Sequence, residues 1–453
     1  HSRFSPTLPP PQPKRGASGR FSNACQEEDI GLGSPSPLAP IEPAKRILII
    51  DVLRGFALLG ILLVNMELFS HPVQLAITPM ETSAAWIDRA ATWAVRFLAE
   101  GKFYSLFSLL FGLGFALQMT RATEKGVRFV PLYARRLLIL LVIGLIHAYL
   151  IWVGDILTLY ALLGFILILF RKTSPNVLVR WVVALLLIPV LFYAFTPGMI
   201  ALGSAQPGVA EQIQQQFEAQ RQAYLADIQR AYEVYANGSF AEITTQRTSD
   251  MNSVAVTSLI VLAPSVFAMF LVGLWFVQKK VFEDLEGNLA FFRRLLVWGL
   301  IIGVPGNILF ASLIGPDSPR FIPSLSVLVA TIGQSFGAPA LSLSYVAALM
   351  LLSCSPAWQQ RLAPLALAGR LAVSNYVSES VICTLMLYGF GLGLLGLVGK
   401  AAGLLLVLAI YVAQVWFSGW WLQRFQYGPM EWLWRSLAYL KWQPMRQPVA
   451  SST

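Results

Sequence analysis

Ten stretches of about 20 mostly apolar residues recur along this chain of 453 residues, and they constrain its fold more than any other feature. A helix needs about 20 such residues to cross the hydrocarbon core of a bilayer. Only 12% of the residues are charged and 56% are hydrophobic, so a soluble fold could not cover the apolar surface. The sequence therefore predicts an all-α fold, a polytopic integral membrane helical bundle with about ten transmembrane helices, and excludes an ordinary soluble enzyme.

The predicted spans are 47–69, 103–120, 137–153, 156–170, 177–195, 254–277, 295–314, 324–353, 371–396 and 401–421. The eighth span is too long and is interrupted between Gly333 and Pro339, which is consistent either with one broken helix or with two short ones. Residues 86–99 are predicted to form a shorter helix at the membrane interface. The count of ten is preferred to eleven because it keeps the basic clusters on one side.

Three further segments flank or interrupt this transmembrane domain, which is assigned to 47–442. Residues 1–46 are rich in proline and contain no apolar signal segment, so a disordered cytoplasmic tail is expected there. Residues 443–453 form a short C-terminal tail. The polar segment at about 197–253 is predicted to be an external helical insertion, and the sequence leaves open whether it is a spacer or a lid.

The distribution of Lys and Arg sets the orientation, because cytoplasmic loops are enriched in these residues. With ten spans, five basic clusters fall on one side of the membrane, and both termini are then cytoplasmic. The clusters are Lys45–Arg46, Arg121–Arg136, Arg171–Arg180, Lys279–Arg294 and Arg424–Arg446.

Composition also excludes several partners and cofactors. Three Cys and three His leave too few ligands for a disulfide framework or a metal site, so no metal is expected. The sequence contains no nucleotide-binding or DNA-binding motif. The net charge of +10 is therefore assigned to loops near the lipid bilayer, not to nucleic-acid binding. The oligomeric state stays open.

The first span carries two charges, which are costly inside a bilayer and mark a functional site by default. Asp51 and Arg54 are three residues apart, so they share a helix face and can pair. Asn65 lies eleven residues after Arg54, about three helical turns, on the same face. The alternative to a functional stripe is an ion pair that only holds helices together.

The third span contains His147, the one His that falls within a predicted span. Arg136 lies eleven residues earlier on the same face, and Asp155 follows at a tight turn. A buried neutral His can act as a general base, and a nearby carboxylate can orient it. The alternative is a His that only bonds a neighbouring helix. His71, in the loop after the first span, is the rival candidate.

The ninth span presents a second polar face. Ser374, Asn375, Ser378 and Glu379 share this face. Asn and Ser often serve only as contacts between helices. Glu379 is harder to explain in that way, and two alternatives are open: its carboxyl is protonated, or it pairs with an Arg such as Arg54.

Taken together, these motifs resemble the YeiB-like family of bacterial inner-membrane proteins, a domain of unknown function, over roughly 45–442. The matching pieces are Asp51-Val52-Leu53-Arg54-Gly55 with Asn65, Phe103 to Gly114, His147 with Gly154-Asp155-Ile156-Leu157, Gly369-Arg370 with Ser374-Asn375-Tyr376, and Gly428-Pro429 with Glu431-Trp432-Leu433-Trp434-Arg435. The first motif is also similar to heparan-α-glucosaminide N-acetyltransferase, which places the family beside a superfamily of transmembrane acyltransferases.

This resemblance implies a multi-pass protein of the cell inner membrane that moves an acyl group from cytoplasmic acyl-CoA to an unknown external acceptor such as a glycan. His147 is then expected to be the base or acyl acceptor, with Asp155 orienting it. Asp51, Arg54, Asn65, Arg136, Asn375 and Glu379 are expected to bind the substrates. A transporter with a polar path and a non-catalytic scaffold remain the alternatives.

Overall fold

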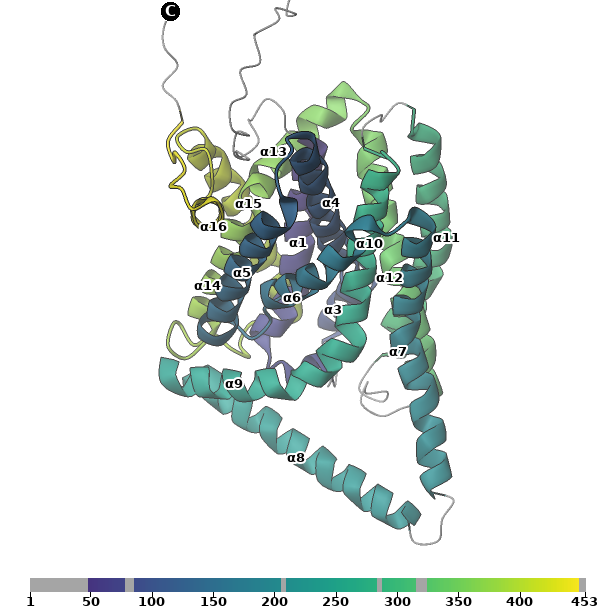
Figure 1. Ribbon diagram of the computed structural model, residues 1–453. Helices are drawn as coiled ribbons and strands as arrows, with labels where there is room; N and C mark the ends of the chain where they lie inside the picture. The colour runs from purple at the N-terminus through teal and green to yellow at the C-terminus, as the bar shows by residue number, and fades with distance from the viewer. Residues whose placement is uncertain (1–47, 78–84, 205–208, 283–286, 315–323, 448–453) are drawn as a thin grey trace, which may run out of the picture.

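The computed structural model is a helical bundle, and it describes residues 48–77, 85–204, 209–282, 287–314 and 324–447 (Figure 1). Within these ranges every regular element is a helix, apart from one isolated bridge between Phe425 and Arg446. The predicted all-α polytopic bundle is therefore confirmed. The tail predicted at 1–46 lies outside the described residues, as does the part of the predicted tail 443–453 that follows residue 447.

Eight helical stretches in the described ranges are long and apolar enough to cross a membrane. They are Leu48–Ser70, Trp86–Glu124, Phe129–Ile151, Pro175–Met199, Ser258–Gln278, Leu289–Leu313, Leu325–Leu352 and Lys400–Leu422. The other two predicted spans, 156–170 and 371–396, are occupied by the shorter helices α6 (Leu157–Leu169) and α14 (Ala372–Leu387). At 13 residues α6 is only about 20 Å long, less than the hydrocarbon thickness.

Helix α1 (Leu48–Ser70) lies at the centre of the bundle. It packs against α4 (Lys102–Glu124), α13 (Pro356–Arg370), α14 and α15 (Lys400–Leu422). A Cβ at Gly369 would lie 1.9 Å from the Asp51 carbonyl oxygen, and one at Gly55 would lie 1.9 Å from the Leu365 carbonyl oxygen. The two backbones therefore touch directly, as small residues allow in membrane bundles.

A second group of helices packs beside this centre. Helix α10 (Ala263–Gln278) contacts α4 and α7 (Pro175–Ser204), and α11 (Leu289–Leu313) pairs with α12 (Leu325–Leu352). Helix α12 is continuous through Pro339, so the eighth span is one helix. Residues 86–98 form a separate helix, α3 (Trp86–Leu98), which ends before Gly101 at a φ of 89°.

The polar insertion is helical and projects beyond one end of the bundle. Helix α8 (Val209–Asn237) runs obliquely from the foot of α7 to α9 (Phe240–Thr257), and the three helices outline a triangle (Figure 1). Helix α9 is anchored by the buried Arg247, whose Nη1 donates to the Tyr149 carbonyl oxygen at 2.8 Å. Asp250 accepts from Gln74 and Tyr235, and burial raises the pKa of this carboxyl.

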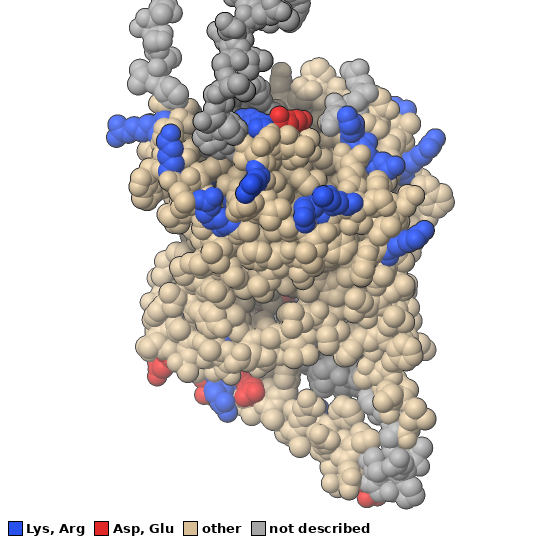
Figure 2. Space-filling view, viewed as in Figure 1, with Lys and Arg blue, Asp and Glu red and all other residues tan. Residues whose placement is uncertain are grey.

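Lys and Arg gather at the opposite end, in a band around the end that holds α16 (Pro429–Tyr439) (Figures 1 and 2). Most of the visible Asp and Glu lie at the end with α8 and α9 (Figure 2). The bundle thus has one strongly basic end and one mixed end.

Candidate functional site

A cavity of about 280 Å³ lies at the basic end, between α1, α4, α5 (Phe129–Ile146), α6, α13, α14 and α16. Five arginines and two carboxylates are among the residues that line it, together with apolar and aromatic side chains. The arginines are Arg54, Arg121, Arg136, Arg370 and Arg435, and the carboxylates are Asp51 and Glu431. An excess of cationic side chains in a partly apolar cavity favours an anionic ligand with an apolar part.

The Asp51–Arg54 pair expected in α1 is present in the cavity wall. Arg54 Nη1 donates to Asp51 Oδ1 at 2.9 Å. The Asp51 side chain is 5% exposed, whereas that of Arg54 is 34% exposed and reaches the cavity. Because Asp51 holds one edge of the guanidinium, Arg54 is oriented without being fully neutralised, and its other N–H groups can serve a ligand.

Arg136 contributes from the first half of α5, with its guanidinium 4.7 Å from the centre of the Trp434 ring. Trp434 also donates from Nε1 to the Arg136 carbonyl oxygen at 2.8 Å, which joins α16 to α5. The buried Nε of Arg136 has no hydrogen-bond partner in the described part of the chain. A buried donor left in this state costs about 1–3 kcal/mol, which a bound acceptor would recover.

In the described contacts Glu431 caps α14. Its Oε1 accepts from the backbone N–H groups of Val373 and Ser374, and its Oε2 accepts from the Ser374 hydroxyl. A carboxylate is stabilised at a helix N-terminus by the backbone N–H groups and the helix dipole. The Gly428–Pro429 start of α16 brings Glu431 to this position.

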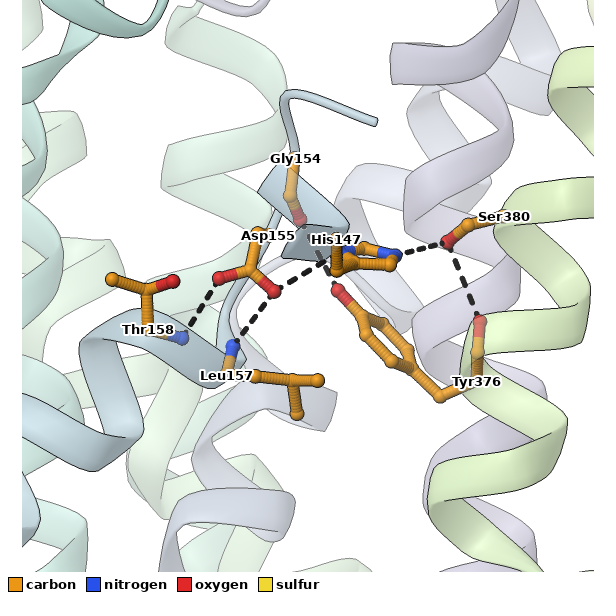
Figure 3. A network of polar contacts seen from close by, with 7 residues as sticks. All are labelled: His147, Gly154, Asp155, Leu157, Thr158, Tyr376 and Ser380. Carbon is orange, nitrogen blue, oxygen red and sulfur yellow. Dashed lines mark hydrogen bonds and ion pairs between the residues drawn. The ribbon is translucent and has the colours of Figure 1, made fainter. Parts of the chain in front are cut away.

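Deeper in the bundle, His147 is the centre of a buried hydrogen-bond network (Figure 3). Its Nδ1 lies 3.0 Å from Asp155 Oδ1, and its Nε2 lies 2.9 Å from Ser380 Oγ. His147 and Ser380 are each 1% exposed, and the Asp155 side chain is 2% exposed. The pairing of His147 with Asp155 is thus present, and Ser380 of α14 completes a chain of hydroxyl, imidazole and carboxylate.

The geometry around Asp155 assigns the proton positions in this chain. Asp155 also accepts from the backbone N–H groups of Leu157 and Thr158, at 3.1 and 2.7 Å (Figure 3). A carboxylate with three such contacts is an acceptor throughout, so the imidazole proton lies on Nδ1. The Nε2 lone pair then faces the Ser380 hydroxyl, which is the arrangement of a base beside the group that it deprotonates.

The backbone is unusual where His147 lies. A π-helical turn, His147–Ile151, replaces the end of α5, and the Trp152 N–H donates to the His147 carbonyl oxygen at 2.8 Å. Such turns are rare and are frequent at functional sites. Here the turn points the imidazole at α14 and lets the chain reverse into Asp155.

The cavity and the His147 network are consecutive along the same helices. Arg136 lines the cavity, and His147 follows eleven residues later, about 16 Å along the axis. Leu157 and Tyr160 line the inner part of the cavity, and Leu157 lies two residues after Asp155. His147 itself is not among the lining residues, so the network lies behind the cavity wall.

Three of the expected binding residues lie elsewhere. Asn65 is half-buried near the far end of α1 and does not line the cavity. Asn375 donates to the Ala368 carbonyl oxygen and to the Ser418 hydroxyl, which are contacts between helices. Glu379 is buried, and in the described residues its carboxyl oxygens have no hydrogen-bond partner. The expected ion pair of Glu379 with Arg54 is absent from the described contacts because Arg54 pairs with Asp51.

The rival histidine, His71, lies in a different setting after the end of α1. Its Nδ1 is 3.2 Å from the Glu67 carbonyl oxygen, and burial lowers its pKa. Glu67 pairs with Lys400 at 2.6 Å and not with the His71 ring. In the described residues no group of three or more His, Cys, Asp and Glu is placed to hold a metal ion.

The fold and this buried polar centre define the class, a polytopic helical membrane protein. Residues 276–441 match the family described as "Protein of unknown function (DUF418)". The chain is 37% identical over 424 residues to the uncharacterized protein YxaH of Bacillus subtilis, which covers 90% of this chain and 98% of YxaH. It is 28% identical over 407 residues to the uncharacterized protein YeiB of Escherichia coli, covering 87% and 96%. The chain belongs to the YeiB-like family of DUF418 proteins. No solved structure matches it.

Proposed function

We propose that this protein is a membrane-bound acyltransferase that takes its acyl group from acyl-CoA at the basic end of the bundle. The observation that carries the proposal is the succession of an arginine-lined cavity and a buried His147–Asp155 pair along one helix. The cavity suits a polyanionic donor with an apolar tail. The His147–Asp155 pair has the geometry of an oriented general base.

The orientation proposed for the chain follows from its charge distribution. The band of Lys and Arg surrounds the end with α16, and cytoplasmic faces of membrane proteins are enriched in these residues (Figure 2). We therefore assign the cavity and both termini to the cytoplasm, and α8 with α9 to the external face. In a bacterium with two membranes, such as the Escherichia coli of the relative YeiB, we assign the protein to the inner membrane.

In this mechanism the arginines bind and His147 moves the proton. Arg54, Arg121 and Arg136 hold the phosphate groups of the donor at the cavity. The thioester arm extends toward the buried network, where His147 Nε2 removes the proton of the attacking hydroxyl. The protonated imidazole is stabilised by Asp155 and then returns the proton to the departing thiolate.

The proposal is tested by thiol release from acyl-CoA. Full-length protein in proteoliposomes should release free CoA thiol from acetyl-, butyryl- or palmitoyl-CoA supplied on the basic side. Protein-free liposomes provide the control. A flux of solute across the membrane without thiol release would favour a transporter, and neither activity would favour a scaffold.

The topology gives an independent prediction. A reporter fused after Thr453 should report a cytoplasmic location, and one inserted within 210–235 of α8 should report an external location. Paired reporters active in opposite compartments check this result. A C-terminal reporter active only outside the cytoplasm would contradict the ten-span arrangement and place the cavity on the wrong side for acyl-CoA.

Arg54→Lys tests the role of the cavity wall. Lysine keeps the charge but loses the planar fork that binds two oxygens at once. A charge-assisted hydrogen bond is worth about 1.5–3 kcal/mol, so the KM for acyl-CoA should rise roughly 10- to 100-fold. The thermal midpoint of the purified variant controls for folding. An unchanged KM would show that Arg54 does not bind the donor and that the Asp51–Arg54 pair only stabilises α1.

A further inference from the structure

We infer that Ser380 is the nucleophile of this site and carries the acyl group as a serine ester between the two substrates. The inference rests on the proposed acyltransferase function and adds a covalent step to it. It stands on the contacts of one hydroxyl that lies 233 residues from His147 in the chain and 2.9 Å from its Nε2 in space. Activated serine nucleophiles are recognised by this geometry, a base within hydrogen-bond reach that a third group orients.

The two hydrogen bonds of the His147 ring, to Asp155 and to Ser380, are arranged so that the ring can accept the Ser380 proton. Asp155 fixes the imidazole proton on Nδ1, so the Nε2 of His147 accepts from the Ser380 hydroxyl. The second acceptor within reach of Ser380 is the Tyr376 carbonyl oxygen, at the longer distance of 3.3 Å (Figure 3). The Ser380 hydroxyl therefore donates its hydrogen bond preferentially to the Nε2 of His147, as in an activated serine.

Two other hydroxyls of α14, those of Ser378 and Thr384, show what a structural role looks like on this helix. Ser378 donates to the Asn375 carbonyl oxygen at 2.8 Å, and Thr384 donates to the Ser380 carbonyl oxygen at 2.8 Å. These are bonds within one helix, which Ser and Thr commonly make. In the described contacts of α14, Ser380 is the hydroxyl that lies against an imidazole.

The depth of Ser380 suits a relay. Val373 lines the cavity, and Ser380 follows seven residues later on α14, about 10 Å further from the basic end. An acyl group held there has left the donor but is still enclosed by the bundle. A covalent intermediate allows the donor to leave the cytoplasmic cavity before an acceptor arrives from the other end, so the two polar substrates need not meet.

The chemistry balances with the two substrates already proposed. His147 Nε2 takes the Ser380 proton while Oγ attacks the thioester carbonyl, and the carbon–sulfur bond breaks. The thiolate receives that proton and leaves as CoA thiol. In the second half, His147 deprotonates the acceptor hydroxyl, which attacks the serine ester. The ester C–Oγ bond breaks, and Ser380 regains its proton.

The test is to trap the ester. Detergent-purified full-length protein is mixed with radiolabelled acetyl- or palmitoyl-CoA without acceptor and quenched in acid within milliseconds to seconds. We expect label on the peptide that contains Ser380, stable to acid and to neutral hydroxylamine but released by alkaline hydroxylamine. Ser380→Ala should lower both this label and thiol release by at least about 10²-fold. Ser378→Ala is the matched control on the same helix and should retain both.

Ser380→Cys supplies a readout that would not change if the hydroxyl had only a structural role, namely the chemical lability of the trapped acyl group. The trapped species should become a thioester, which neutral hydroxylamine releases. Label on His147, or label and thiol release unchanged in Ser380→Ala, would overturn the nucleophile while leaving the acyltransferase in place. Thiol release by the wild type without label at Ser380 would overturn it as well.

A second probe separates failure of the donor from failure of the nucleophile. If no acyl-CoA gives thiol release, the proposed function fails, and a serine-directed alkyl fluorophosphonate then decides the role of Ser380. Adduct at Ser380 that is lost in His147→Ala would support the nucleophile with another acyl donor. If the fluorophosphonate does not label Ser380, the assignment of Ser380 as the nucleophile is overturned.

Discussion

His147→Ala should lower acyl transfer by about 10²- to 10⁴-fold, the usual contribution of a general base. The imidazole is the one group in the network that contacts both Asp155 and Ser380, so its removal leaves the hydroxyl without a base. The rate of thiol release at equal amounts of detergent-extracted protein measures the effect. Membrane yield should change little because Asp155 keeps its two backbone N–H donors and Ser380 can still donate to the Tyr376 carbonyl oxygen.

His71→Ala is the comparison for this prediction and should have a much smaller effect. His71 contacts the Glu67 carbonyl oxygen and the edge of the Tyr232 ring, and it lies outside the cavity at the basic end. A dead His71→Ala with an active His147→Ala would move the site to the far end of α1. If both variants stay active, neither histidine acts as the general base, and the transporter is favoured over the enzyme.

Gly369→Ala should destabilise the bundle, although alanine normally strengthens a helix. The added Cβ would lie 1.9 Å from the Asp51 carbonyl oxygen and 2.8 Å from the Gly55 nitrogen, so α1 and α13 must separate. Overpacking of this kind costs about 1–3 kcal/mol. The shift would also displace Asp51 and Arg54, so the thermal midpoint and the affinity for acyl-CoA should fall together.

Gly198→Ala is the matched control in α7, because nothing lies within 4 Å of the Cβ it adds. This variant should be neutral or gain up to about 1 kcal/mol from helix propensity. If Gly369→Ala keeps the wild-type thermal midpoint, the close approach of the two backbones has no energetic importance.

Hydropathy predicted the bundle well because crossing a membrane requires long apolar segments, and helices such as α1, α4, α7 and α12 follow the predicted spans closely. It was less informative where helices are short or polar. Helix α13 was not predicted because polar residues such as Gln359, Gln360 and Arg361 interrupt its apolar residues. The predicted span 371–396 is too long because α14 ends at Leu387, although apolar residues continue beyond it.

The candidate site was partly predictable for the same kind of reason. Asp51 and Arg54 lie three residues apart, and helical geometry alone brings them together. Asp155 follows His147 closely enough for a turn to join them. Ser380 could not be found in this way, because its contact with His147 depends on how α14 packs against the π-helical turn, a tertiary arrangement that no spacing encodes.

The π-helical turn at His147 also makes the chain sensitive to length at one point. A π turn closes its hydrogen bond over five residues where an α turn uses four, so it holds one residue more than a regular helix would. Deleting Leu150 would let the segment close as α-helix and remove the π turn that points the imidazole at α14. It would also shorten the chain between His147 and Asp155, whose side chains now meet at 3.0 Å. At this position a single-codon deletion should be more harmful than most substitutions.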